Sequence, residues 1–290
     1  INQSAITASA DNTILPFTAS PVQTAQVSYT GGSSSATAAY STTTPLVCSV
    51  DASTGAVTDI AAGRCTVVVT LAADVNYNVA TASVLIRFGK VDQATLTASA
   101  NSTSTTFNSA NVITATATGG SGTGSLSYAT NSSTCSVDAT TGVVTITGAG
   151  DCVIDVTKAT DLDYNPATSS VTIAVAKAAQ ATLTAAKTGN TTYGSSTVIT
   201  ISATGGSGTG AVSYSTSSSA CSVDATSGEI TIITAGSCVV TATKAADANY
   251  SQTTGSVTVT IAKANQASFT ASADNTSVTY NDGTAITVST

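Results

Sequence analysis

Six cysteines are the side chains whose types and spacing point most directly to chemistry. They fall into three pairs, and the two members of every pair are 17 residues apart. One spacing repeated three times favours disulfide bonding within each pair over the other connectivities. A metal site, the alternative, would need C-x-x-C knuckles or interleaved His, and the chain has no His. We therefore expect an oxidising compartment and three disulfides: Cys48–Cys65, Cys135–Cys152 and Cys221–Cys238.

Side chains suited to acid–base or nucleophilic catalysis are scarce. Without His there is no imidazole base and no Ser-His-Asp triad. The single glutamate, Glu229, follows a predicted turn and has no recurring carboxylate to pair with. The Gly-rich runs at 119–124 and 205–210 lack the Lys and the helix start of a phosphate-binding loop. The sequence therefore predicts no enzyme activity and no cofactor.

Calcium is the metal for which oxygen ligands recur. An Asp followed two residues later by Asn or Asp and then by Tyr occurs at 74–77, 161–164 and 247–250. Calcium takes six to eight oxygens, and each of these loops offers two side chains, so Asx turns that position the Tyr are favoured over metal binding. If a metal does bind, Asp161 and Asp163 are the candidate ligands.

Composition excludes further classes of function. Of 290 residues, 8% are charged, with 8 basic and 15 acidic side chains and a net charge of -7. Neutralising phosphates needs clustered Lys and Arg, so we expect no nucleic-acid partner. No run of about 18 apolar residues occurs, so no membrane span is expected. Any secretion signal is expected to lie outside these residues.

An internal repeat of 86 to 87 residues determines the expected domain organisation. It spaces the first cysteine of each pair and the lysines Lys90, Lys177 and Lys263. A Gly-rich segment recurs as well, as TGGSGTGSLSY from Thr118 and TGGSGTGAVSY from Thr204. We expect these residues to belong to a longer array and to contain three repeats and part of a fourth: 1–91, 92–178, 179–264 and 265–290.

Each repeat reads as a series of short strands. Near the end of the third repeat Val257, Val259 and Ile261 alternate with Thr and Ala, the period of a strand with one buried face. Between the paired cysteines, D-A-x-x-G segments such as Asp138 to Gly142 predict hairpin turns. About seven strands in some 86 residues predict an all-β, immunoglobulin-like β-sandwich with one disulfide in each domain.

The repeats share an order of motifs, which are a Tyr, then Cys-Ser-Val-Asp-Ala-x-x-Gly, then Gly-x-Cys, then an Asp-x-Asn/Asp-Tyr segment and a Lys-Ala junction. In the order of its motifs, each repeat resembles bacterial immunoglobulin-like repeats of the Big type. Such repeats occur in tandem in large secreted or surface-attached bacterial proteins. The resemblance implies a β-sandwich, an extracellular or cell-surface location and a spacer, adhesive or filament-building role. The first repeat departs from the pattern with Leu71 in place of a Lys, with FGKV at its junction and with an insertion near 16–30.

Two functions follow from these expectations. In the first, the repeats form a stiff stalk or the building block of a fibre or sheath, because the junctions VAKAAQATL and IAKANQASF contain no Gly or Pro. The expected partners are then neighbouring repeats or further copies of the chain. The alternative is an adhesin whose modules bind a glycan or a surface ligand. The tyrosines that such a site would use recur in every repeat, which favours packing: Tyr40, Tyr128 and Tyr214.

Overall fold

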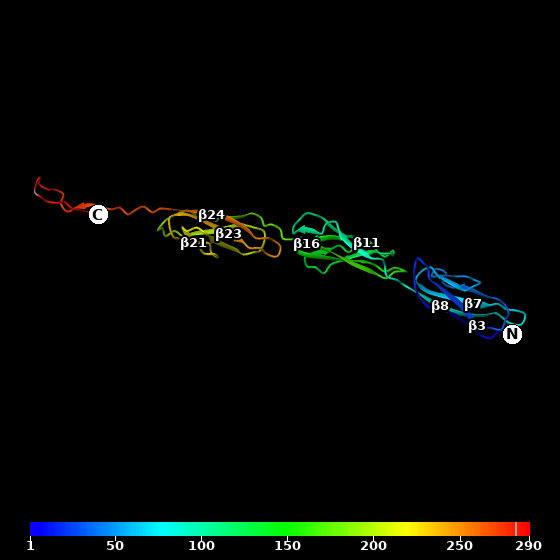
Figure 1. The fold of residues 1–290 in the computed structure, drawn as a ribbon. Helices are drawn as coiled ribbons and strands as arrows, with labels where there is room; N and C mark the ends of the chain where they lie inside the picture. The colour runs from blue at the N-terminus through cyan, green and yellow to red at the C-terminus, as the bar shows by residue number, and fades with distance from the viewer. Residues whose placement is uncertain (282) are drawn as a thin grey trace. The chain divides into compact units, whose positions relative to one another are not determined.

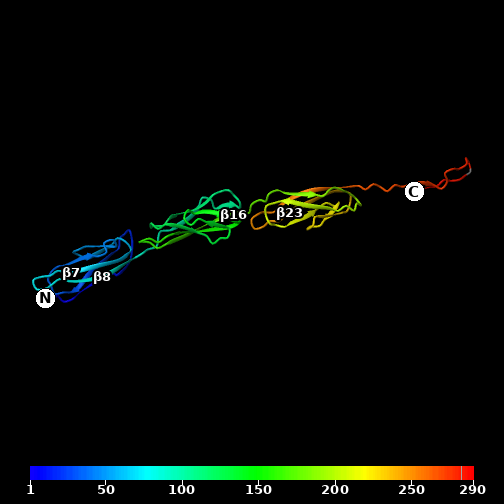
Figure 2. The same cartoon turned by 180° about the vertical axis from the view of Figure 1, so that it is seen from behind.

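The computed structural model describes residues 1–281 and 283–290, which form β-strands and their connections. The chain comprises two compact units, residues 1–176 and residues 177–290. The first unit contains strands β1 to β16 and the second contains β17 to β26. Figure 1 labels strands of both units, and Figure 2 shows β16 and β23 from behind. Among the described residues there is no helix long and apolar enough to cross a membrane.

Three groups of eight strands recur along the chain, and we call them the first, second and third sandwich. The first comprises β1 (Ile6–Ala10), β2 (Ile14–Pro16), β3 (Thr24–Gly31), β4 (Ala38–Thr42), β5 (Cys48–Val50), β6 (Ala56–Asp59), β7 (Gly63–Leu71) and β8 (Ala80–Gly89). The second comprises β9 (Leu96–Ala100), β10 (Ser104–Thr106), β11 (Ile113–Gly119), β12 (Leu126–Ala129), β13 (Cys135–Val137), β14 (Val143–Ile146), β15 (Gly150–Lys158) and β16 (Ala167–Ala176).

The third sandwich repeats this series, and a short strand pair follows it. The third comprises β17 (Leu183–Lys187), β18 (Thr191–Thr192), β19 (Ile199–Gly205), β20 (Val212–Thr216), β21 (Cys221–Val223), β22 (Glu229–Ile232), β23 (Gly236–Lys244) and β24 (Thr253–Ala262). After it, β25 (Ser272–Ala273) pairs with β26 (Val288–Ser289). The repeat boundaries themselves stay a prediction.

Every sandwich consists of two four-stranded sheets with the same strand order. In the first sandwich these orders are β1-β3-β6-β5 and β2-β8-β7-β4. This is the arrangement of immunoglobulin domains, in which one sheet carries the first, second, fourth and fifth main strands and the other carries the rest. The predicted all-β, tandem immunoglobulin-like fold is therefore confirmed. The sequence suggested about seven strands, and the eighth is a short one, β2, β10 or β18, that runs parallel to the last strand of its sandwich.

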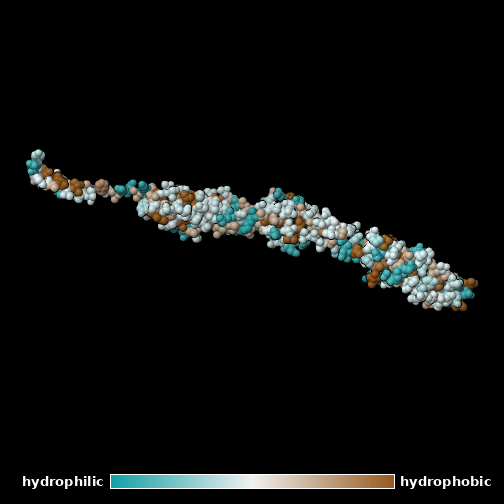
Figure 3. Space-filling view, in the orientation of Figure 1, coloured by the Kyte–Doolittle hydropathy of each residue, from teal (hydrophilic) through white to brown (hydrophobic). Residues whose placement is uncertain are grey.

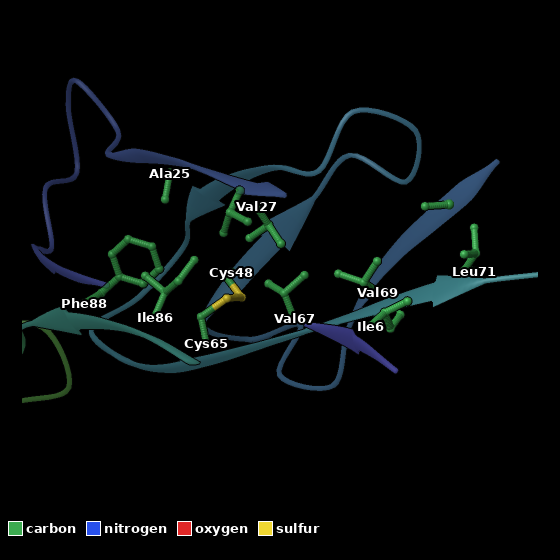
Figure 4. Close-up of a cluster of buried hydrophobic side chains, with 12 residues drawn as sticks. Ile6, Ala25, Val27, Cys48, Cys65, Val67, Val69, Leu71, Ile86 and Phe88 are labelled. Carbon is green, nitrogen blue, oxygen red and sulfur yellow. A yellow bond between two sulfur atoms is a disulfide. The ribbon is translucent and has the colours of Figure 1, made fainter. Parts of the chain in front are cut away.

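The core of each sandwich consists of the inward side chains of both sheets. Figure 4 shows the first, where Val27, Val67, Ile86 and Phe88 surround the disulfide. All four side chains are at most 1% exposed, because they lie on the faces of their strands that point into the core. Outside the core the surface is mostly pale in Figure 3.

Disulfides connect the two sheets of each sandwich. Cys48 starts β5 and Cys65 lies in β7, two strands that belong to opposite sheets, and their Cα atoms are 5.8 Å apart. The bond therefore links the two sheets across the core. The disulfide of antibody domains also joins the two sheets, but it connects a different pair of strands. The equivalent bonds join Cys135 to Cys152 and Cys221 to Cys238.

The hairpin turn between β5 and β6, and its counterparts, explain the D-A-x-x-G segments. Asp51 Oδ1 accepts hydrogen bonds from the N–H groups of Ser53 and Thr54, at 3.0 and 2.7 Å. These donors, with that of Thr54 contributing most, lower the pKa of Asp51 from 3.8 to about 2. Gly55 closes the turn with φ +75°, and a Cβ there would lie 2.6 Å from the Val27 carbonyl oxygen and 2.8 Å from Tyr40. Only glycine fits this position.

Candidate functional site

The feature that recurs at one end of all three sandwiches is a loop that holds the segment by which the chain enters the sandwich. The loop connects β7 to β8, β15 to β16 or β23 to β24, and each copy contains one Asp that organises it. We call this loop, together with the entering segment that it holds, the linker clamp. Its organising residues are Asp74, Asp161 and Asp247.

One carboxylate oxygen of this Asp folds the loop on itself. Oδ1 of Asp247 accepts the N–H groups of Asn249 and Tyr250 at 2.9 and 2.8 Å. Oδ1 of Asp161 does the same for Asp163 and Tyr164, at 3.0 and 2.9 Å. These are the Asx turns that the sequence favoured over a metal site.

The second carboxylate oxygen joins the loop to the Gly-rich segment. Asp247 Oδ2 accepts the N–H of Thr209 at 2.6 Å, and Asp161 Oδ2 accepts that of Thr123 at 2.5 Å. These donors are the largest cause of the lowered pKa of each carboxyl, which is about 2 for Asp247. A Cβ on the neighbouring Gly208 would lie 2.2 Å from Asp247 Oδ2, so glycine is needed for this close approach.

The first sandwich shows what happens when this glycine is absent. Its Gly-rich segment has Ser34 at the corresponding position. The N–H of the next residue, Ser35, lies 3.1 Å from Asp74 Oδ2. The contact is thus longer than in the other two sandwiches, where glycine lets the two loops approach.

A glutamine in the entering segment bridges both ends of the clamp loop. Gln180 Nε2 donates to the carbonyl oxygens of Ala245 and Ser251, at 3.0 and 2.8 Å. Gln93 Nε2 contacts Ala159 and Asn165 in the same way, at 3.2 and 2.9 Å. In the first sandwich Gln3 Nε2 donates to the Asn78 carbonyl at 2.6 Å.

Backbone hydrogen bonds fix the same segment. Ala178 donates to the Asn249 carbonyl and accepts from the N–H of Ser251, both at 2.9 Å. Val91 forms the same parallel bridge with Tyr164. The recurring lysine before the bridge adds a side-chain contact, since Lys177 Nζ donates to the Asp247 carbonyl.

In the first unit the clamp loop of the second sandwich also contacts the first sandwich. The backbone N–H of Ala62 donates to Asp163 Oδ1 at 2.6 Å. The rings of Phe17 and Tyr164 pack edge to face, with centroids 6.3 Å apart and an interplanar angle of 86°. The insertion near 16–30 that sets the first repeat apart thus supplies part of this contact.

The residues considered as metal ligands therefore serve as hydrogen-bond acceptors. Both oxygens of Asp161 accept backbone N–H groups, and Asp163 Oδ1 accepts that of Ala62. Within residues 1–281 and 283–290 no cluster of three His, Cys, Asp or Glu is placed to hold a metal ion. A cation at this loop would compete with N–H donors for both oxygens of Asp161 and for one oxygen of Asp163.

Tyrosines considered for glycan binding lie beneath the hairpin turns. Tyr128 is 8% exposed, and its ring is 3.1 Å from where a Cβ on Gly142 would be. Tyr40 and Tyr214 are half-buried in the same place under Gly55 and Gly228. A ring in this position supports the turn and offers little surface to a ligand.

Sequence reasoning missed the glutamines of the clamp. Their signal was present, because Gln3, Gln93 and Gln180 recur close to the repeat period. Their partners are 64 to 75 residues further along the chain, so no local pattern identifies them.

Comparisons with known proteins leave the family open. No family model matches the chain, and no curated protein matches it. Among solved structures, Drosophila N-cadherin EC1-4 gives a TM-score of 0.34 at 13% identity over 91% of this chain and 76% of that one. Domains 1-6 of the surface layer protein SbsC give 0.27 at 14% identity, over 91% and 41%. A 282-residue intimin fragment gives 0.26 at 19% identity, over 67% and 70%. TM-scores below 0.5 support no inference about function.

Proposed function

We propose that this chain is a non-enzymatic structural repeat region of an extracellular bacterial surface protein, acting as a stiff stalk or as the building block of a fibre or sheath. The linker clamp is the observation that carries the proposal. A freely jointed array would leave its linkers solvated, as Gly- and Ser-rich linkers are. Here the entering segment is bound to its sandwich by side-chain and backbone hydrogen bonds.

Three further observations support this proposal. Disulfides persist in oxidising compartments, which favours a location outside the cell. The carboxylates with lowered pKa accept turn and clamp N–H groups, so they are structural acceptors. The resemblance to Big-type repeats supports the bacterial and surface-attached parts of the proposal. The adhesin alternative has less support, because its candidate tyrosines pack under turns.

Stiffness at the junction between the first and second sandwiches provides the test. Spin labels at two exposed positions, Ser83 and Thr172, would report the distance distribution across this junction by pulsed electron resonance. We expect a narrow distribution in the natural chain. The double substitution Gln93→Ala and Asp163→Ala removes the clamp bonds to Asn165 and Ala62, so it should broaden the distribution.

A matched control is Glu229→Ala, which removes an exposed charge in the third sandwich and should leave the distribution unchanged. An equally broad distribution in the natural chain and in the clamp variant would contradict the stiff-stalk proposal. Saturable binding of the chain to a defined glycan on an array would instead favour the adhesin.

A further inference from the structure

The only two arginines of the sequence lie directly opposite each other on neighbouring strands. Arg64 in β7 pairs with Arg87 in β8, and both side chains are exposed. Like charges at such a position destabilise a sheet. In the described part of the chain, neither guanidinium has an ion-pair or hydrogen-bond partner. The electrostatic repulsion between the two arginines is therefore not offset by any other described residue of the sheet.

Beside these arginines lies a shallow hollow of about 290 Å³, which Lys90 and Leu162 also line. Within the described part of the chain, the Lys90 ammonium donates only to uncharged oxygens, namely Thr160 Oγ1 at 3.0 Å and the Asp161 carbonyl. The nearby carboxylates of Asp161 and Asp163 accept N–H groups of Thr123 and Ala62. Among the described residues, the three cationic side chains that line this hollow therefore have no carboxylate bound to them. We call Arg64, Arg87 and Lys90 the basic patch.

In the second sandwich the same sheet position has the opposite charge. Counting from the second cysteine of each pair, Asp151 occupies the position of Arg64, and Ser237 occupies it in the third sandwich. Asp155 lies on the same outer face of β15, four residues further on. Both carboxylates are exposed, and in the described residues no side chain donates to either of them. We call Asp151 and Asp155 the acidic patch.

We propose that the basic patch of one chain binds the acidic patch of a second copy of the same chain. The two patches occupy equivalent outer faces of the same kind of sheet, and their charges are complementary. Each face also has an apolar side chain, Leu85 beside Arg87 and Val153 between the aspartates, and both are 37% exposed. Two guanidiniums side by side present the planar donor array that suits a carboxylate.

This contact joins different surfaces of the two copies, so it is heterologous. An occupied basic patch leaves the acidic patch of the same chain available to a third copy, which permits open-ended assembly. The inference rests on the proposed function in one respect, because a fibre or sheath needs a lateral contact of this kind. Exposed ion pairs are individually weak, so the contact depends on both arginines and both aspartates engaging together.

Neutral versions of both patches are available from the third sandwich itself. Arg64→Ser with Arg87→Thr copies Ser237 and Thr260 and gives a chain without the arginines. Asp151→Ser with Asp155→Thr copies Ser237 and Thr241 and gives a chain without the acidic patch. Since these residues are already accommodated in the equivalent strands of the third sandwich, both variants should fold, which circular dichroism would check.

Sedimentation equilibrium at low ionic strength tests the proposal. The natural chain should show a weight-average mass above that of the monomer, falling back toward the monomer at 0.5 M NaCl as charge screening shortens to a few ångströms, of order 4 Å. Each variant alone should associate at least tenfold more weakly. An equimolar mixture of the two variants should form a one-to-one complex, because each retains the patch that the other lacks.

The control is Lys187→Ser with Lys263→Thr, which removes one positive charge from β17 and one just after β24 and should leave association unchanged. The proposal is overturned if the natural chain stays monomeric, if either variant associates as the natural chain does, or if the mixture does not pair. Binding of an acidic polysaccharide such as polygalacturonate at the arginines, without self-association, would also overturn it. None of these outcomes changes the distance distribution expected across the junction between the first and second sandwiches. The self-association proposal and the stiff-stalk proposal can therefore fail independently.

Discussion

Removing one disulfide should destabilise one sandwich and leave the others unchanged. The change is Cys221→Ala with Cys238→Ala, which replaces two side chains that are 3% and 0% exposed. The bond closes a segment with a sequence separation of 17. In the chain-entropy model a loop of this length contributes about 3 kcal/mol to the free energy of unfolding. For a domain of this size, each kcal/mol corresponds to about 4 to 8 °C in melting temperature.

Differential scanning calorimetry of the whole chain would measure the effect. We expect one transition to move down by roughly 12 to 24 °C and the remaining transitions to stay in place. Reduced natural chain is the matched control, because it keeps the buried sulfur atoms while losing all three bonds, so every transition should move. A shift smaller than about 4 °C in the variant would refute the view that the bond compensates for a small core. A shift in the variant but not in the reduced chain would assign the effect to lost packing.

Three further predictions concern the turns and the clamp. N–H donors lower the pKa of Asp51 and Asp247 from 3.8 to about 2. These carboxylates therefore stabilise the fold at pH values above 3.8, and they lose that effect as the pH falls toward 2. The denaturation midpoint should be constant from pH 7 to 5 and should fall below pH 4. Gly142→Ala should lower the free energy of unfolding by about 2 kcal/mol or more, because φ is +72° and a Cβ would lie 2.3 Å from a carbonyl oxygen. The control Gly189→Ala, whose Cβ would have no atom within 4 Å, should change it by at most about 0.5 kcal/mol. Chemical denaturation measures both. Gln180→Ala should speed hydrogen exchange at the clamp amides without changing exchange in the core strands, and unchanged clamp amides would contradict the role given to this side chain.

Alternation along the strands was enough to predict which residues face the core. Val257, Val259 and Ile261 lie on the inner face of β24, with the last two at most 2% exposed. A strand with one solvent face has a period of two, and only one register places the apolar set inside. The D-A-x-x-G turns were equally predictable, because the Asp acceptor and the positive-φ Gly are local requirements.

Features that depend on pairing between distant segments escaped prediction. The eighth strand of each sandwich has two or three residues, too few for a periodic signal. The clamp joins a Gln to carbonyl groups more than 60 residues away, and the arginine pair exists only because of the register between β7 and β8. The sequence could identify Asp161 and Asp163 as a motif, but it could not show that N–H donors reach both oxygens of Asp161 and one oxygen of Asp163.

The disulfide between opposite sheets limits how far a sandwich can lengthen under tension. When force unfolds the third sandwich, the residues between Cys221 and Cys238 stay looped out of the load path. A fully extended chain spans about 3.3 to 3.6 Å per residue, and the bonded cysteines already span 5.7 Å, so the bond reduces the extension on unfolding by roughly 50 to 55 Å. A chain under sudden load would therefore extend in shorter steps, and it would regain the withheld length only if the bond were reduced.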